Sequence, residues 1–101
     1  MAFEVRLSEE AADDMVRIWI YVATTSGSAR ADDLDSRLQA ACGKLAHFPR
    51  RGSPRDELGP GLRSVAFQRR ATIIYRVCEL AVEVTRILYA GQDPKREFGA
   101  S

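Results

Sequence analysis

The arginine side chains are the groups in this sequence that could do chemistry, because they are numerous and lie close together along the chain. Residues 50–76 contain seven arginines and no lysine, against only Asp56 and Glu57. This segment therefore carries a net charge of +5, whereas the whole chain carries +1. Guanidinium groups bind carboxylates and phosphates through paired hydrogen bonds, and arginine is enriched at protein interfaces. The segment as a whole predicts a binding surface, although any single arginine in it can equally be an ordinary solvated side chain.

Arg86 differs from the other arginines because it falls in line with apolar residues. With a period of two along residues 81–89, it shares a face with Val82, Val84 and Leu88. An unpaired guanidinium on such a face would be costly. Two interpretations remain open: Arg86 pairs with a carboxylate beneath the helices, or it lies where the face opens and belongs to a site.

Conventional catalytic and metal-binding patterns are not visible in the sequence. His47 is the single histidine, and capping the last carbonyl groups of a helix is its simplest role. Cys42 and Cys78 form no CxxC motif, so we expect both to be small buried residues. Tyr75 and Tyr89 are expected to pack in the fold with a solvated hydroxyl group. The sequence thus predicts no metal, no cofactor and no small-molecule substrate.

Length and composition predict one small domain spanning residues 1–101. The hydrophobic fraction is 46% and the charged fraction 29%, which are ordinary values for a folded domain. No apolar run approaches the roughly 18–20 residues that a membrane span requires. Glu4 and Arg6 interrupt the first residues, where a signal peptide would be apolar. We therefore expect a cytoplasmic protein without a membrane partner.

The first half of the chain predicts a strand followed by a helical hairpin. Residues 3–7 alternate apolar and charged side chains, and Ser8 is a suitable N-cap for a first helix. The apolar residues of that helix recur at helical spacing: Ala12, Met15, Val16, Trp19, Val22 and Ala23. A second helix should begin near Ser28 and end before Pro49. Its apolar stripe consists of Ala31, Leu34, Leu38, Ala41, Leu45 and Phe48.

The second half of the chain predicts a long loop and a three-stranded meander. Residues 49–61 contain three prolines and three glycines without a hydrophobic period, which is typical of a loop. Strands are expected over residues 62–67, 71–77 and 81–89, and a short final helix should start at Pro94. The order β-α-α-β-β-β defines an α+β fold, in which an antiparallel sheet packs against a two-helix hairpin and a short C-terminal tail or helix follows.

Seven short motifs in this order resemble the ParE toxins of the RelE/ParE superfamily, which belong to type II toxin–antitoxin systems. They cover nearly the whole chain: VRLSEEAADD (5–14), IWIYV (18–22), LAHFP (45–49), GSPR (52–55), ELGPGLRS (57–64), IIYRV (73–77) and VTRILY (84–89). The resemblance implies the β-α-α-β-β-β fold. It also implies a growth-inhibiting toxin that binds DNA gyrase and blocks replication without a chemical step of its own, and that a cognate ParD-like antitoxin neutralises.

The RelE branch of the same superfamily cleaves mRNA in the ribosome, and it provides the alternative function. RelE-like nucleases resemble one another in a Tyr-Arg pair at the start of a strand, where this chain has Ala71 and Thr72. Several relatives carry histidine at the position of Tyr89. Ribosome binding through phosphates also favours a strongly basic protein, whereas the net charge here is +1. These departures favour a binding toxin over an enzyme; a third hypothesis is a non-toxic binding module that keeps the fold.

Two binding surfaces are predicted from the arginine cluster and the resemblance together. The target-binding surface consists of Arg63, Arg69, Arg70, Arg86 and Tyr89, with the tail after Gly91. The antitoxin-binding surface consists of Ile18, Trp19, Ile20 and Tyr21, because Ile18, Ile20 and Tyr21 lie off the main stripe of the first helix and should be exposed. The antitoxin is expected to present an amphipathic helix with acidic residues that wraps the helical hairpin, and it could add a strand to a sheet edge.

Overall fold

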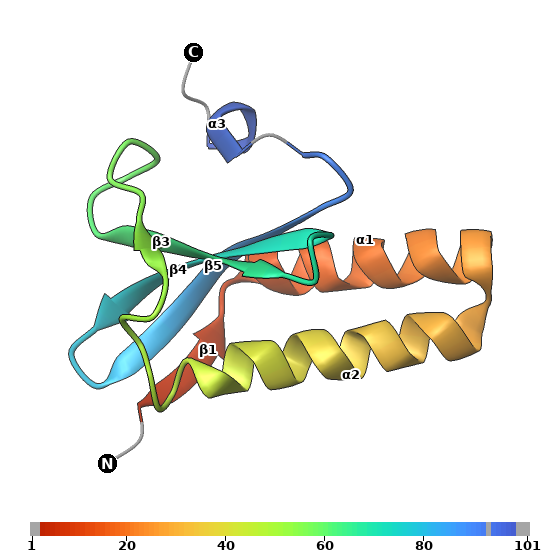
Figure 1. Ribbon diagram of the computed structural model, residues 1–101, viewed down its shortest axis with the longest axis horizontal. Coiled ribbons are helices and arrows are strands. Elements are labelled where there is room, and N and C mark those ends of the chain that lie inside the picture. The colour runs from red at the N-terminus through yellow and green to blue at the C-terminus, as the bar shows by residue number, and fades with distance from the viewer. Residues whose placement is uncertain (1–2, 93, 99–101) are drawn as a thin grey trace.

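A computed structural model describes residues 3–92 and 94–98 of the chain (Figure 1). In chain order the described elements are β1 (Glu4–Leu7), α1 (Glu9–Ser26), α2 (Ser28–Lys44), β2 (Ser53–Pro54), β3 (Leu62–Phe67), β4 (Ala71–Cys78), β5 (Ala81–Tyr89) and α3 (Pro94–Glu97). The strands form one sheet in the order β1-β5-β4-β3-β2. The α1–α2 hairpin packs along one side of this sheet (Figure 1), and the α+β class and element order predicted from the sequence are confirmed.

The helical hairpin forms at the residues predicted from the capping signals and from the apolar stripe of the second helix. The hydroxyl oxygen of Ser8 accepts a hydrogen bond of 3.0 Å from the Ala11 amide and so caps α1. Gly27, whose φ is +94°, provides the turn between the helices, a conformation that a residue with a Cβ rarely adopts. Five positions of α2 and its following turn are buried: Ala31, Leu34, Leu38, Cys42 and Leu45. The predicted stripe is therefore confirmed at Ala31, Leu34, Leu38 and Leu45, whereas Ala41 is only half-buried. Phe48 is 66% exposed because α2 already ends at Lys44.

The buried face of α1 differs from the predicted stripe. Its buried residues are Ala11, Asp14, Ile18 and Val22, whereas Ala12 and Val16 are exposed. The face is rotated by about one residue because α1 packs against the edge of β5 as well as against α2. The expectation that Ile18 is exposed is therefore wrong, since only 6% of this residue is accessible to solvent.

The sheet is mixed, which corrects the predicted purely antiparallel arrangement. β1 pairs in parallel with β5, from Glu4 opposite Ala81 to Leu7 opposite Val84. The other strand pairs are antiparallel, and they include β2, which pairs with β3 from inside the predicted loop. The N-terminal strand thus closes the sheet at the edge opposite β2, and its pairing depends on residues almost 80 positions away in sequence.

A β-bulge in β5 changes which side chains share a face. Arg86 lies opposite Ile74, but the next pair is Val84 with Tyr75, so Thr85 is an extra residue in β5. Val84 consequently faces the helices, whereas Arg86 faces the opposite side of the sheet together with Ile74. The predicted common face of Val82, Val84, Arg86 and Leu88 is therefore wrong, because a period of two does not continue across a bulge.

Apolar clusters lie on both faces of the sheet. The main cluster fills the space between the helical hairpin and the sheet. A second cluster on the other face contains Leu58, Leu62, Ile74 and Leu88, and Phe98 after α3 packs against it. Of the two cysteines, Cys42 is buried as predicted, whereas Cys78 is exposed at the end of β4. None of the helices in the described part of the chain has the length and apolarity needed to cross a bilayer.

Candidate functional site

Arg86 pairs with Asp14, a carboxylate of α1 that the sequence had not singled out. The Asp14 oxygens accept hydrogen bonds from Nε of Arg86 at 2.7 Å and from its Nη2 at 3.0 Å. Glu97 of α3 accepts a longer one, of 3.4 Å, from the same Nη2. The hydrogen bond to Asp14 is the main cause that raises the pKa of Arg86 above its ordinary value. The arginine that the pattern placed among apolar residues is thus held in an ion pair.

Asp14 also completes the edge of β5. Since β1 ends at Leu7, the part of β5 beyond Val84 has no strand beside it on this edge. The hydroxyl group of Ser8 donates to the Thr85 carbonyl at 2.8 Å, and the Asp14 carboxylate accepts from the Ile87 amide at 2.9 Å. Side chains at the start of α1 therefore supply the hydrogen bonds that a neighbouring strand would otherwise provide. This explains why Asp14 is tolerated at only 4% exposure.

Arg63 is turned toward the backbone of the segment that precedes β2. Its Nη2 donates to the carbonyl oxygens of Arg50 at 3.0 Å and of Gly52 at 2.7 Å. The Gly52 amide in turn donates to the hydroxyl group of Tyr75 at 2.9 Å. Tyr75 is fully buried, so the expectation that its hydroxyl group is solvated is wrong. Arg63 and Tyr75 together fasten this segment to the sheet.

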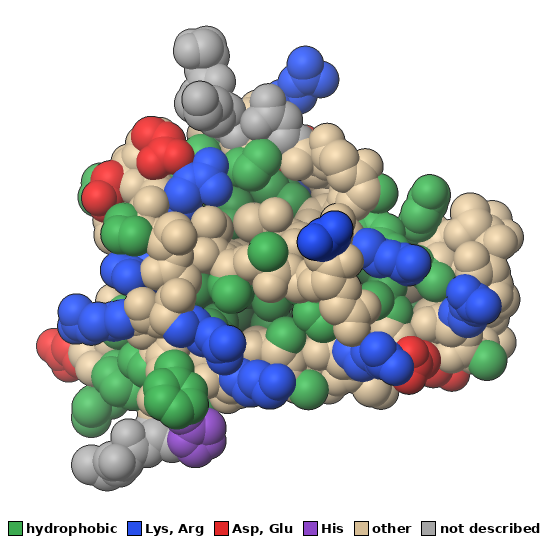
Figure 2. All heavy atoms as spheres, viewed as in Figure 1, with side chains coloured by type: hydrophobic (Ala, Val, Ile, Leu, Met, Phe, Trp, Pro, Cys, Tyr) green, Lys and Arg blue, Asp and Glu red, His purple; other side chains and the backbone are tan. Residues whose placement is uncertain are grey.

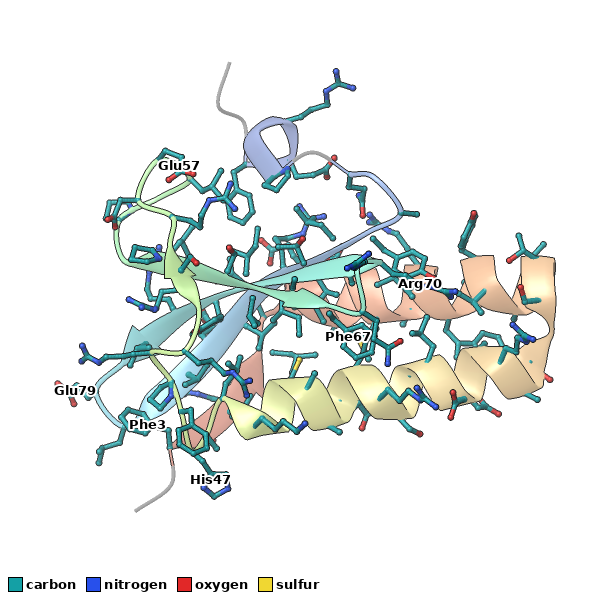
Figure 3. The ribbon with its side chains drawn as sticks, in the orientation of Figure 1. Phe3, His47, Glu57, Phe67, Arg70 and Glu79 are labelled. Atoms are coloured by element: carbon teal, nitrogen blue, oxygen red, sulfur yellow. The ribbon has the colours of Figure 1, made fainter. Side chains whose placement is uncertain are left out.

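The β3–β4 hairpin brings Arg69 and Arg70 to the surface at one end of the sheet. Gln68 and Arg69 adopt positive φ values of 48° and 57° in its turn, and both arginines are exposed (Figure 3 labels Arg70). Tyr89, at the end of β5, lies opposite Ala71, the first residue of β4, and is half-buried. Its ring meets that of Tyr21 edge to face, with centroids 6.1 Å apart.

The structure therefore separates the predicted target-binding residues into two groups. Arg69, Arg70 and Tyr89 lie together at the end of the sheet, where the backbone of Ala90 hydrogen-bonds to that of Arg70. The guanidinium groups of Arg63 and Arg86 form hydrogen bonds inside the fold instead. The tail after Gly91 continues into α3, while Asp93 and residues 99–101 lie outside the described residues.

The predicted antitoxin-binding residues are exposed to different extents. Ile20 and Tyr21 are each 54% exposed. Ile20 lies on the outer side of α1, one turn after Val16, whereas the ring of Tyr21 contacts Tyr89 of β5. Trp19 is half-buried, and its indole nitrogen donates to Asp32 of α2 at 2.9 Å. Ile18 points into the core. The apolar surface that α1 offers to a partner is thus smaller than the sequence predicted.

A basic groove between α2 and β3 is a feature that the sequence reasoning missed. We define it by the cations Arg30, Arg37, Lys44, Arg51 and Arg70, which line two adjoining hollows that share Arg37 and Gln68. Figure 2 shows lysine and arginine side chains gathered on this face of the molecule. The seven-residue spacing of Arg30, Arg37 and Lys44 could have revealed it, because residues seven apart lie on the same side of a helix.

The described part of the chain offers few groups that could bind a metal ion or transfer a proton. Across residues 3–92 and 94–98, no three His, Cys, Asp or Glu side chains are grouped so that they could hold a metal ion. His47 lies in the exposed turn after α2 and is labelled in Figure 3. The side chains that dominate the surfaces described above are cationic or aromatic. Such groups are suited to recognition of another macromolecule.

Solved structures with a similar fold come from toxin–antitoxin complexes. The chromosomal ParDE system of P. aeruginosa contains a chain with a TM-score of 0.78 and 19% identity, matched over 89% of this chain and 98% of that one. The complex RelBE2 of Mycobacterium tuberculosis contains one with a TM-score of 0.62 and 21% identity, matched over 89% of this chain and all of that one. At these identities the likeness establishes the fold.

Sequence comparison is more specific. The chain is 32% identical to Toxin ParE1 of Caulobacter vibrioides over 94 residues, which cover 93% of this chain and 96% of that toxin. Residues 5–94 match the family described as ParE toxin of type II toxin–antitoxin system, parDE. This match includes the helical hairpin, the β3–β4 hairpin with its arginines and the strand that carries Arg86. The chain therefore belongs to the ParE toxin family of type II toxin–antitoxin systems.

Proposed function

We propose that this toxin binds DNA gyrase and inhibits it, so that replication is blocked without a chemical step catalysed by the toxin. The observation that carries the proposal is the family match over residues 5–94, because gyrase inhibition is the activity associated with ParE-like toxins. The exposed guanidinium groups of Arg69 and Arg70 support it, since neither forms an ion pair with another described residue and both can engage carboxylates or phosphates. Because gyrase acts on the bacterial chromosome, the proposal places the toxin in the cytoplasm.

Binding without catalysis is supported by the residues at the start of β4. The RelE-like nucleases resemble one another in a Tyr-Arg pair at this position, where Ala71 is buried and Thr72 half-buried here. Neither side chain carries the positive charge that would neutralise a phosphate during cleavage, and neither exchanges a proton near neutral pH. Of the predicted basic residues, Arg63 and Arg86 are also engaged inside the fold. A ribosome-dependent nuclease is therefore the less favoured function.

The second part of the proposal is that a ParD-like antitoxin neutralises the toxin. The P. aeruginosa structure described above is a ParDE system, and this chain shares its fold. Exposed apolar side chains on α1, such as Ile20, provide surface that a protein partner could cover. Neutralisation follows if the bound antitoxin covers or distorts the surface that meets gyrase.

Purified toxin in two parallel assays tests the proposed activity. We expect inhibition of gyrase supercoiling and no specific mRNA cleavage in a translation extract. The double variant Arg69→Glu/Arg70→Glu should lose inhibition, while Arg17→Glu, a charge reversal on the exposed side of α1, should retain it. Cleavage without gyrase inhibition would establish the nuclease function instead, and inactivity in both assays would favour a non-toxic binding module.

A further inference from the structure

The charged side chains of α2 are sorted between two sides of the helix. Arg30, Arg37 and Lys44 line the basic groove, on the side that faces β3 and the β3–β4 turn. Asp35 instead lines a hollow formed with β1 and α1, and Asp32 accepts a hydrogen bond of 2.9 Å from α1. The helix therefore turns a cationic side toward the groove and these two carboxylates away from it.

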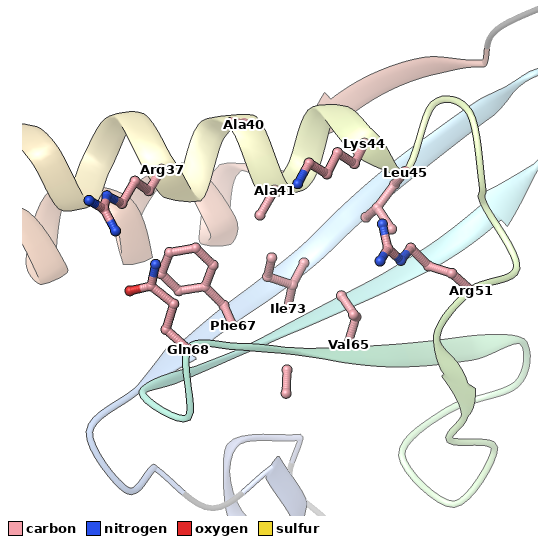
Figure 4. A pocket seen from close by; sticks show the side chains of 11 residues that line it. Arg37, Ala40, Ala41, Lys44, Leu45, Arg51, Val65, Phe67, Gln68 and Ile73 are labelled. Carbon is pink, nitrogen blue, oxygen red and sulfur yellow. The ribbon is translucent and has the colours of Figure 1, made fainter.

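Two cations outside α2 complete the lining of the groove. Arg51 reaches its larger hollow, of about 470 Å³, from the segment after α2, and Arg70 reaches the smaller one, of about 420 Å³, from the β3–β4 turn. Figure 4 shows Arg37, Lys44 and Arg51 around the larger hollow. Among the described residues of the lining, Asp33 is the acidic one, and it is paired with Arg37 at 3.1 Å. The groove therefore keeps a strong excess of positive charge.

The apolar side chains beneath these cations offer little surface to an occupant. Leu45 and Ile73 have no exposed surface, and Phe67 is only 8% exposed. The accessible apolar part of the lining consists mainly of alanine side chains and the half-buried Val65. An amphipathic segment of a protein would thus bury little of its apolar side here. The exposed cations, with the amide of Gln68 that lines both hollows, are suited to a polar anion instead.

We infer that the basic groove binds the phosphate backbone of duplex DNA, and that this DNA is the segment held by gyrase. The inference rests on the proposed function, because the target brings its DNA to the toxin. Duplex DNA carries one negative charge for about every 1.7 Å of its axis, whereas the cations of α2 follow one another at about 10.5 Å along the helix. Each cation can therefore reach a phosphate in many registers. Such contacts depend on charge and not on base sequence.

The groove is continuous with the surface proposed to meet gyrase. Arg70 lines the smaller hollow, and together with Arg69 it forms the exposed pair at the β3–β4 turn. A toxin that contacts its target through this turn presents the neighbouring groove to the same complex. In gyrase at work that complex includes DNA, whose charge density is high along its whole length. The toxin should therefore bind DNA-loaded gyrase more tightly than the free enzyme.

Titration of a short fluorescein-labelled DNA duplex with the full toxin, followed by anisotropy, tests the inference. We expect the wild type to bind with a dissociation constant of about 10⁻⁶–10⁻⁴ M at physiological salt, equally for A·T-rich and G·C-rich duplexes. Lys44→Gln/Arg51→Gln should bind about 10- to 100-fold more weakly at about 0.1 M salt, and the slope of log K against log salt concentration should fall by about 2.

The matched control is Arg17→Gln, which removes a cation from the exposed side of α1. It should bind the duplex within about twofold of the wild type. Thermal unfolding of each variant verifies that it is folded.

A supercoiling assay with the same proteins separates this inference from the proposed function. The double variant should need at least about 10-fold more toxin than the wild type for half-inhibition, while the control should need the same amount. If the wild type binds the duplex through the groove but does not inhibit gyrase, the proposed function fails, while the assignment of the groove to DNA is supported.

Three results would overturn the inference. The first is equal binding of the duplex by the double variant and the wild type. The second is a wild type that does not bind the duplex, together with weaker binding of the double variant to DNA-free gyrase, which would assign the groove to an acidic protein surface. The third is tighter binding of an RNA duplex of the same sequence, which would point to the ribosome-dependent nuclease.

Discussion

The Asp14 carboxylate holds the Arg86 guanidinium with two hydrogen bonds, 2.7 and 3.0 Å long, and simultaneously accepts the Ile87 amide at 2.9 Å. The two residues are 72 positions apart, so this one carboxylate joins the first helix to the last strand. The pair lies at the β-bulge, where β5 continues beyond the end of β1. Asp14 therefore serves the strand edge and the ion pair at once.

Replacing Asp14 with alanine should destabilise the toxin strongly. The substitution leaves a largely buried guanidinium without its main partner and the Ile87 amide without an acceptor. Breaking such a pair costs about 3–5 kcal/mol, a large part of the stability of a small domain. Urea unfolding measures the loss. Asp13→Ala removes a neighbouring exposed carboxylate and should change stability by less than about 0.5 kcal/mol; equal effects of the two substitutions would contradict the structural role of Asp14.

Removing the hydroxyl group of Tyr75 should loosen the segment before β2. Tyr75→Phe leaves the buried Gly52 amide without its acceptor at 2.9 Å, at a cost of about 1–3 kcal/mol. Hydrogen exchange should show faster exchange of the Gly52 amide together with the lower stability. Tyr21→Phe is the control, because Tyr21 is half-exposed and its hydroxyl group forms no hydrogen bond with another described residue. An unchanged exchange rate at Gly52 would show that this hydrogen bond contributes nothing.

Two glycine-to-alanine substitutions should have opposite effects. A Cβ at Gly52 would lie 2.6 Å from the Ser64 carbonyl oxygen, so the backbone must shift and β2 must separate from β3. At Gly43, inside α2, a Cβ would meet no atom within 4 Å. We expect Gly52→Ala to destabilise by about 1–3 kcal/mol and Gly43→Ala to stabilise by about 0.5–1 kcal/mol. Thermal unfolding measures both, and stabilisation by Gly52→Ala would contradict the close packing described here.

The two cysteines should differ in reactivity. Burial raises the pKa of the Cys42 thiol from 9.0 to about 11, whereas Cys78 is exposed. Iodoacetamide at pH 8 should therefore label Cys78 in the native toxin, and Cys42 should react only after unfolding. Mass spectrometry of the labelled peptides identifies the modified residue. Rapid labelling of Cys42 under native conditions would contradict its position in the core.

The same pKa shift predicts a dependence of stability on pH. Because the thiol of Cys42 binds its proton more tightly in the folded state, its contribution to stability is complete below pH 9.0 and is lost as the pH rises toward about 11. The variant Cys42→Ala should lack this component of the alkaline decline. Urea unfolding between pH 8 and 11 compares the two proteins, and identical profiles would show that Cys42 does not contribute.

Local sequence patterns determined the elements whose partners are close in the chain. The apolar stripe of α2, the Ser8 cap and the turns of the meander each depend on spacing within one or two turns of helix or one strand pair. The arginine-rich segment was also visible, because composition requires no knowledge of the fold. The seven motifs that resemble the ParE toxins were recognisable too, because each is a short continuous stretch of sequence.

Tertiary structure decided how those elements pack together and which arginines remain exposed for binding a partner. The bulge at Thr85 reversed the faces predicted for β5, and the parallel entry of β1 left an edge that Asp14 completes. Arg63 and Arg86 were drawn into the fold, whereas Arg69 and Arg70 remained exposed. The physical reason is that a guanidinium pairs with whichever oxygen the fold brings near it, and residues far apart in sequence meet only when the helices and the sheet pack together.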